Sequence, residues 1–374
     1  MGNKGRILSA RLRNTLNNRL IEAKSYSEEK LTCFLKSKNS HIKTLAFLAL
    51  LPASFAVAPS SAISQHTHIT LAKTATETDK CNFIPVNNLK FPVRPSGHMS
   101  QNTFTQVIKT AEQVYDPIFQ KLGYGRFRVL PLWQNDDVNA IAFMCDPSEL
   151  QSIAGNQDPR IVCKGVMNTS PGIYIKTRVV EMFGGLARHP LMTAEGLLLV
   201  LCHEIGHHLG GYPTYTGRTL STEGQADYFS TSKCARTILS QVPNNEGWAQ
   251  MAAIPLQVRV SCQNSFPNSI KDAAICMRSS MAGLTLARVL ASFKGDWRAV
   301  DFAKRDKTKV IKTYESHPQA QCRLDTYYSG ALCNISEKVP FSLQDPRTGA
   351  CTLQKLQFDS ARPSCWYRDP FVKI

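Results

Sequence analysis

The chain has 374 residues, a formal net charge of +16, 43% hydrophobic residues and 12 cysteines. A chain of this length and composition can bury a sizeable core, as one large or two modest globular domains. The basic residues outside the first 58 lack the Lys/Arg runs and interleaved aromatics that are typical of nucleic-acid surfaces, so we expect no nucleic-acid partner.

The first 58 residues are predicted to be a leader that contains a secretory signal peptide. Residues 1–43 hold ten Lys and Arg against three Glu, and the apolar stretch from Thr44 to Ala58 closes on small residues. This order matches the n-region, h-region and cleavage site of a signal peptide, and the stretch is short for a membrane span. We expect export to the periplasm or the extracellular space, with no stable membrane span after signal removal. A retained N-terminal anchor is the alternative.

Eleven cysteines follow the leader, and they lack the CxxC pairs of a zinc ribbon. In an oxidising compartment such cysteines are expected to form disulfides. Cys202 lies in a predicted buried helix and is interpreted as the unpaired thiol, which leaves ten cysteines for five bridges. The shortest loops are the cheapest to close, and they would join Cys145–Cys163, Cys262–Cys276 and Cys322–Cys333.

Residues 59–99 are rich in Ser, Thr, Pro and Asn and are predicted to be a linker or an N-terminal arm. The alternative is a prosegment in which the Cys81 thiolate caps a metal ion. From Ser100 to Leu122, apolar residues recur on one face and predict an amphipathic helix. Strands are expected at residues 126–130, around Asn139 and at residues 172–176, which together predict a small mixed sheet.

The strongest chemical signal lies in the next predicted helix. Thr193 is an N-cap residue type, a near-continuous apolar run follows, and Gly210-Gly211 can end the helix. Within it, His203-Glu-Ile-Gly-His207 forms an HExxH pattern. Its two imidazoles project from one helical face and can share one Zn²⁺, with Glu204 facing the open position of the metal. The alternative is a chance match of this five-residue pattern. A third metal ligand elsewhere in the sequence would distinguish a zinc site from a chance match.

Two acids downstream include a candidate for that third ligand. The metzincin ligand, a His six residues after the second His, is excluded because Pro213 stands there. Glu223 and Asp227 form an i, i+4 pair on one helical face, so Glu223 can complete a His₂Glu set and Asp227 can accept the second N–H of a ligand imidazole. Two solvated acids on a surface helix are the alternative. His208 projects away from the metal-facing side and receives no ligand role.

These motifs resemble those of the gluzincin metallopeptidases, which include the CAAX prenyl protease, HtpX and periplasmic BepA-like proteases. In that family a Glu-x-x-Ala-Asp helix follows HExxH, which matches Glu223-Gly-Gln-Ala-Asp227. Val138 to Phe143 resembles the family's Asn-Ala strand, which lines the substrate cleft. Glu315 to Leu324 resembles its His-Pro segment followed by an Arg. The four motifs occur in the family's order over about residues 138–324.

The resemblance implies an α+β, zincin-like fold that is mainly helical, with a small mixed sheet, a central HExxH helix and stabilising disulfides. Further core helices are expected at residues 268–293 and 318–332. The predicted division is a leader, an arm, a metallopeptidase domain and a disulfide-tied tail, at residues 1–58, 59–99, 100–334 and 335–374. No internal repeat is present, so the tetratricopeptide domain of BepA-like proteins is missing.

The implied function is that of a secreted or periplasmic zinc endopeptidase acting on extended or unfolded protein. One Zn²⁺ per chain would be held by His203, His207 and Glu223, and Glu204 would be the general base for a zinc-bound water. By resemblance, His317 and Asn139 would donate to the developing oxyanion, and Asp227 and Arg323 would support the site. Prenylated substrates are not expected, because the family's membrane helices are missing. The alternatives are a non-catalytic zincin acting as an envelope assembly factor and a zinc amidase on cell-wall peptides.

Overall fold

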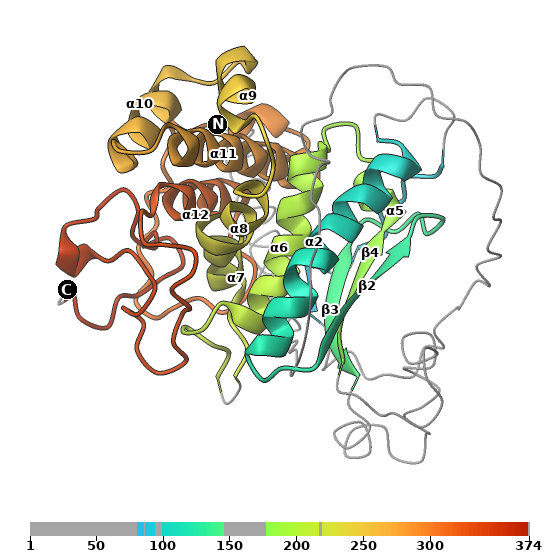
Figure 1. The fold of residues 1–374 in the computed structure, drawn as a ribbon, viewed down its shortest axis with the longest axis horizontal. Helices are drawn as coiled ribbons and strands as arrows, with labels where there is room; N and C mark the ends of the chain where they lie inside the picture. Colours follow the sequence, from blue (N-terminus) through green and yellow to red (C-terminus); the bar gives the residue numbers. More distant parts are fainter. Residues whose placement is uncertain (1–80, 86, 94–98, 146–176, 217–218, 373–374) are drawn as a thin grey trace, which may run out of the picture.

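The computed structural model describes residues 81–85, 87–93, 99–145, 177–216 and 219–372. Within them the chain is mainly helical with one small mixed sheet, which confirms the predicted α+β class (Figure 1). The predicted signal peptide, the predicted strand at residues 172–176 and Cys163 lie outside the described residues.

The sheet has four strands in the order β1-β3-β4-β2. β2 (Arg126–Leu132) pairs in parallel with β4 (Thr177–Phe183), β4 pairs antiparallel with β3 (Ala140–Cys145), and β3 pairs antiparallel with β1 (Cys81–Asn82). The sequence analysis did not predict β4, because the strand is buried along its whole length and lacks the alternation of a half-exposed strand. It also missed β1, which lies in the region interpreted as a linker or arm.

One long helix, α2 (Gln101–Lys121), packs along the sheet beside α6, as the amphipathic pattern predicts (Figure 1). The helix begins at Ser100, whose hydroxyl accepts a hydrogen bond from the Thr103 N–H at 3.1 Å. Near its other end, Asp116 accepts from the main-chain N–H of Phe127 at 2.8 Å and pairs with Arg126, both on β2. These contacts fix the helix on the sheet.

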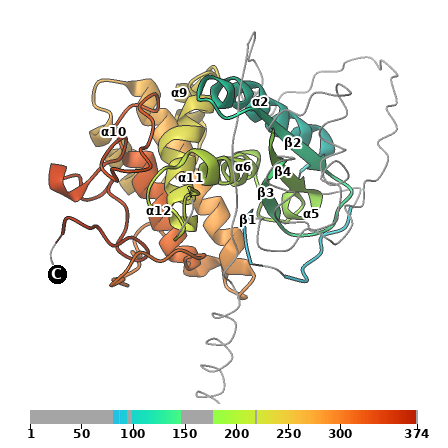
Figure 2. The same ribbon diagram turned by 90° about the horizontal axis from the view of Figure 1, so that it is seen from below.

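The predicted HExxH helix, α6 (Ala194–Leu209), runs through the middle of the molecule. It lies between the sheet with α2 on one side and the helices α11 (Ile270–Ser292) and α12 (Ala320–Leu332) on the other (Figures 1 and 2). Thr193 is its N-cap, accepting from the Gly196 N–H at 3.0 Å, which confirms the predicted start. Residues 194–208 are buried apart from Glu195, because a helix that is apolar all round has to pack on all sides.

α11 and α12 confirm the two later helices that the sequence predicts. Within the described part of the chain, α11 alone is long and apolar enough to cross a membrane, but 78% of that window is buried in the fold, as in a core helix. The remaining elements are short: α5 (Gly184–Ala187), α7 (Glu223–Phe229), the π-helical η2 (Ser230–Ala235), α8 (Arg236–Leu239), α9 (Asn245–Met251), α10 (Leu256–Ser265), η3 (Trp297–Ala299) and η4 (Leu353–Lys355).

Four disulfides join cysteines in the described residues: Cys202–Cys234, Cys262–Cys276, Cys322–Cys365 and Cys333–Cys351. The predicted Cys262–Cys276 bridge is confirmed. The predicted Cys322–Cys333 bridge is wrong, because these residues lie at opposite ends of α12, about 16 Å apart along the helix axis, whereas a bridge spans at most about 7 Å between Cα atoms. Each cysteine instead pairs with the C-terminal tail. The Cys145–Cys163 pairing lies outside the described side chains.

The interpretation of Cys202 as an unpaired thiol is also wrong. The α7–η2 segment packs against α6 and brings Cys234 to a Cα separation of 5.5 Å from Cys202. This bridge is next in sequence to His203, so it ties the predicted metal helix to the segment that carries Glu223. Four buried bridges indicate that the protein folds in an oxidising environment.

Removing the Cys202–Cys234 bridge with a double Cys→Ala substitution is expected to lower the free energy of unfolding by roughly 3–4 kcal/mol, given the 32 residues it closes. It should also weaken binding of zinc added at the predicted His203 site, because the backbone beside His203 loses a restraint. Removing Cys262–Cys276 in the same way is the control. Loss of that bridge should lower the free energy of unfolding, measured with a denaturant, by roughly 3 kcal/mol without changing zinc affinity. Equal zinc affinity in both double variants would contradict the prediction.

The C-terminal tail packs against the helix that carries Glu223. The Trp366 ring lies so close to Gly224 that a Cβ at this glycine would overlap it. Arg362 is buried in the same region and donates to the Gln225 side chain at 2.6 Å and to the main-chain oxygen of Tyr212 at 3.1 Å. The tail therefore fixes the position of α7 relative to the end of α6.

Candidate metal centre

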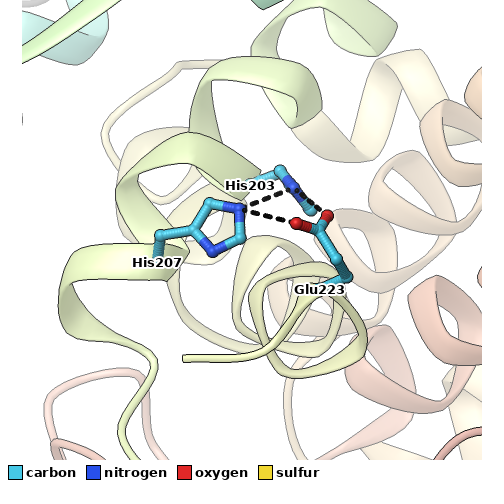
Figure 3. Close-up of side chains that lie close together, drawn as sticks. All are labelled: His203, His207 and Glu223. Carbon is cyan, nitrogen blue, oxygen red and sulfur yellow. Dashed lines mark hydrogen bonds and ion pairs between the residues drawn. The ribbon is translucent and has the colours of Figure 1, made fainter. Parts of the chain in front are cut away.

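The two helices that carry the predicted ligands approach closely at a glycine. A Cβ at Gly206 would lie 2.8 Å from both the Cα and the main-chain oxygen of Ala226 on α7. Glycine is therefore required where the HExxH helix crosses α7. The crossing turns His203 and His207 toward Glu223 (Figure 3).

The three predicted ligands face a common centre. The Nε2 atoms of His203 and His207 are 3.1 Å apart, and they lie 3.2 and 3.6 Å from the Oε2 and Oε1 atoms of Glu223 (Figure 3). Tetrahedral bonds of about 2.0–2.1 Å to zinc would place neighbouring ligand atoms roughly 3.3 Å apart. The spacing therefore fits one ion of this size, and the three residues form a buried group that could hold it.

The other nitrogen of each imidazole is bound to an acceptor. His203 Nδ1 lies 2.7 Å from Asp227 Oδ1, and His207 Nδ1 lies 2.9 Å from the main-chain oxygen of Ser221. Each Nδ1 therefore carries the hydrogen and leaves a lone pair on Nε2, which is the tautomer that a metal requires. Two lone pairs 3.1 Å apart repel each other unless a cation or a proton lies between them. The donor set thus fits a bound metal ion.

The two oxygens of the Glu223 carboxylate have different surroundings. Oε1 accepts a hydrogen bond from the Tyr215 hydroxyl at 2.7 Å. Oε2 is buried and faces the ring nitrogens of His203 and His317 at 3.2 and 3.3 Å, without a well-aligned hydrogen bond among the described residues. A buried carboxylate needs compensating positive charge, which a cation at the common centre would supply.

The pKa values of these groups follow from burial and from one another. Burial raises the pKa of Glu204 to about 8 and lowers that of His207 to about 4. Burial also opposes the charged form of His203, but the carboxylates of Asp227 and Glu223 outweigh it and raise its pKa to about 9. For Glu223, burial is outweighed by His317, His207 and His203, which hold its pKa well below the usual range. The arrangement favours positive charge at the centre, where a metal ion would replace the His203 proton.

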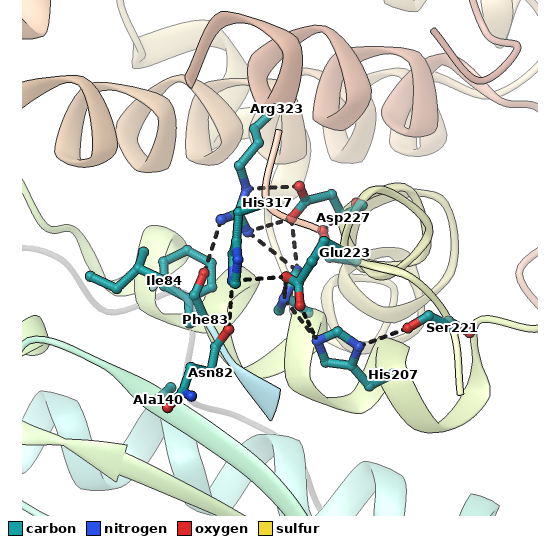
Figure 4. Close-up of polar contacts among 12 residues, drawn as sticks. Asn82, Phe83, Ile84, Ala140, His207, Ser221, Glu223, Asp227, His317 and Arg323 are labelled. Carbon is teal, nitrogen blue, oxygen red and sulfur yellow. Dashed lines mark hydrogen bonds and ion pairs between the residues drawn. The ribbon is translucent and has the colours of Figure 1, made fainter. Parts of the chain in front are cut away.

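A buried ion pair supports His203 from behind. Arg323 on α12 donates to both carboxylate oxygens of Asp227 at 2.7 Å, and it donates to the main-chain oxygen of Phe83 at 2.9 Å (Figure 4). Asp227 and Arg323 are 0% and 1% exposed. The guanidinium therefore neutralises the acid that orients a ligand imidazole, a geometry that fits the supporting role the sequence analysis gave to both residues.

The structure brings His317 to the centre but gives Asn139 a different partner. His317 Nε2 lies 3.3 Å from Glu223 Oε2 and donates to the main-chain oxygen of Asn82 at 2.9 Å (Figure 4). Both amide atoms of Asn139 bind the main chain of Ile84, at 3.1 and 3.0 Å. Asn139 thus holds the segment after β1 in place. His208, which was given no ligand role, is buried with its ring edge against Phe119.

Three residues at the centre were not identified from the sequence. They are Tyr215, which binds Glu223, and the pair Asn82 and Phe83. The ring of Phe83 packs edge-on against His203 at a centroid distance of 5.3 Å. The one signal for the pair is the short apolar Phe83-Ile84 within a polar stretch. Tyr215 has no local signal, because its contact depends on the loop between α6 and α7.

Fold and site define a disulfide-bonded α+β protein in which two histidines of an HExxH helix and a glutamate of α7 form a buried group that could hold a metal ion. No family model, no curated protein and no solved structure matches the chain. The chemistry of the site therefore carries the functional assignment.

Replacing Glu223 with Ala is expected to reduce zinc affinity by more than the roughly 10–100-fold that loss of an outer-shell partner costs. Elemental analysis after dialysis against a competing chelator measures this loss. Glu112→Ala, on α2 away from the centre, is the control and should keep its zinc. Full zinc content in Glu223→Ala would show that the third ligand is a different residue.

Proposed function

We propose that the protein is a zinc-dependent endopeptidase of the gluzincin type that hydrolyses extended or unfolded protein segments. The observation that carries the proposal is the His203, His207 and Glu223 centre, with both imidazoles in the ligand tautomer and Glu204 buried on the same helix. When bound there, Zn²⁺ would lower the pKa of a water molecule toward about 7 and polarise the scissile carbonyl. The resemblance of the four motifs to gluzincins supports the same assignment.

Glu204 would act as the general base. It follows ligand His203 directly on α6 and is completely buried. In the proposed reaction its carboxylate takes a proton from the attacking water and passes it to the amine of the leaving peptide. Among the described residues of the centre, Glu204 alone combines this position with a carboxylate that the proposed ligand set leaves unused.

His317 would stabilise the developing negative charge on the carbonyl oxygen. Its Nε2 already donates to a peptide carbonyl, that of Asn82, at 2.9 Å. A donor held in this position lowers the barrier when the oxygen it faces becomes more negative. Asn139, the second donor implied by the resemblance, would contribute indirectly, because its amide is engaged with Ile84.

The substrate would bind along β3 as an added strand, in the place that the two-residue strand β1 occupies in the structure. Main-chain hydrogen bonds at a sheet edge recognise extended chain and depend little on sequence. The four disulfides support action in an oxidising compartment, which we propose to be the periplasm or the extracellular space after export by the N-terminal leader.

Elemental analysis and a quenched-peptide assay test this function together. We expect one zinc per chain, with cleavage that stops when the zinc is chelated and returns when zinc is restored. Absence of zinc would contradict the metal site. Cleavage that survives complete metal removal would contradict the zinc-dependent chemistry.

One observation favours a second candidate, a zincin that binds zinc without catalysis. The three ligands are at most 2% exposed, and closed sites are typical of structural zinc. Glu204 argues against this candidate, because a purely structural site gains nothing from a further buried carboxylate. A zinc-loaded protein without peptide hydrolysis, in the wild type and in variants with an opened site, would favour it.

A further inference from the structure

The segment Cys81–Ile84 lies where an extended peptide would bind. Cys81 and Asn82 pair antiparallel with Ala142 and Ile141 of β3, and the Phe83 N–H donates to the Ala140 oxygen at 2.9 Å. In the strand order β1-β3-β4-β2, β3 would be the edge strand of the described sheet without this segment. The segment therefore makes the hydrogen bonds of β-strand addition.

The same segment crosses the candidate metal centre. The Asn82 carbonyl accepts from His317 Nε2 at 2.9 Å, beside Glu223, and the next side chain, Phe83, packs against His203 (Figure 4). A peptide carbonyl thus faces the donor that would polarise a scissile carbonyl. The Asn82–Phe83 peptide takes the place that a bound substrate would take at the centre.

The binding position of Phe83 favours an aromatic side chain. The Phe83 ring is 0% exposed. It makes a T-shaped contact with the His203 imidazole, and the carbon of the Arg323 guanidinium lies 4.6 Å from the centroid of the Phe83 ring. A cation over an aromatic face and an edge-on ring contact are both specific attractions for an aromatic residue. Arg323 also binds the Phe83 carbonyl, so one residue recognises both the main chain and the side chain.

We propose that Asn82–Ile84 acts as an intramolecular pseudosubstrate that covers the metal centre, and that peptides with an aromatic residue at the Phe83 position are the substrates that displace it. This inference rests on the proposed peptidase function and adds its regulation and substrate class. In the alternative prosegment arrangement, the Cys81 thiolate would bind the metal, but the side chain of Cys81 is outside the described ones. In the arrangement proposed here, the main chain of Asn82–Ile84 and the Phe83 ring cover the metal centre, and this segment is called the cover below.

The test compares Phe83→Ala with Phe104→Ala in the full-length, zinc-loaded chain. Both phenylalanines are 0% exposed in the same core cluster, but Phe104 packs against Trp133 and does not contact the centre. Two rates are measured: zinc loss to 1,10-phenanthroline, and hydrolysis of quenched peptides that carry either Phe or Ala at the position after the cleaved bond.

Phe83→Ala is expected to lose zinc and to cleave peptides at least about tenfold faster than the wild type, because opening of the cover becomes more favourable. Phe104→Ala should stay close to the wild type, and Phe peptides should be cleaved faster than Ala peptides. Faster zinc loss without any cleavage would support the cover and contradict the peptidase. Equal rates of zinc loss and cleavage in Phe83→Ala and the wild type would overturn the cover.

If Phe83→Ala does not fold, hydrogen exchange in the wild type tests the same inference. The main-chain amides of Phe83 and Ile84 should exchange through local opening, faster than the buried amides of β4. A synthetic peptide with the sequence Lys-Cys-Asn-Phe-Ile-Pro should increase that exchange by competing for β3. Exchange of both amides only at the rate of global unfolding, with or without the peptide, would overturn the inference.

Discussion

Glu204→Gln is expected to lower the rate of peptide hydrolysis by roughly 10²–10⁴-fold and to leave one zinc bound per chain. Gln has the shape of Glu but cannot take the proton of the attacking water. The ligands His203, His207 and Glu223 are untouched. Because burial already disfavours the charged carboxylate and raises the pKa of Glu204 to about 8, the neutral amide should not destabilise the fold.

The measurement is kcat/KM on a quenched peptide, in the wild-type background and in the Phe83→Ala background, where the centre is expected to be open. Glu112→Gln on α2 is a matched control and should keep full activity. Loss of zinc from Glu204→Gln would assign Glu204 to the ligand set. Retained hydrolysis would exclude Glu204 as the base.

Arg323→Met is expected to lower the free energy of unfolding by about 3–5 kcal/mol, because it leaves the Asp227 carboxylate buried without its charge partner. The variant also loses the hydrogen bond to the Phe83 carbonyl. Since Asp227 orients His203, we further expect zinc affinity to fall by roughly 10–100-fold. Urea unfolding and a zinc competition titration measure the two effects.

Adding Asp227→Asn to Arg323→Met should recover part of the lost stability, because the uncompensated charge is removed. Arg347→Met breaks an exposed pair with Asp345 and is the control, with little expected change in stability. If Arg323→Met and Arg347→Met unfold at the same urea concentration, the buried Asp227–Arg323 pair contributes nothing to the stability of the fold. The inference that this pair holds His203 in place would then be wrong.

The features of the site that the sequence could predict are local. An i, i+4 spacing on one helix fixes the common direction of His203 and His207, and the same spacing places Glu223 and Asp227 on one face of α7. The N-cap at Thr193 and the amphipathic α2 depend on neighbouring residues in the same way. Short-range backbone geometry is enough to determine such features.

Only the tertiary structure decided how distant segments meet. Cys202 pairs with Cys234 because the α7–η2 segment packs on α6. Cys322 and Cys333 lie at opposite ends of α12, too far apart to pair, and each forms a disulfide with a cysteine of the C-terminal tail instead. Phe83 reaches His203 across more than a hundred residues because a two-residue strand joins the edge of β3. Sequence spacing carries no information on such contacts, since they depend on packing between whole elements. The sequence thus determined the chemistry of the proposed centre, and the fold decided what supports it and what covers it.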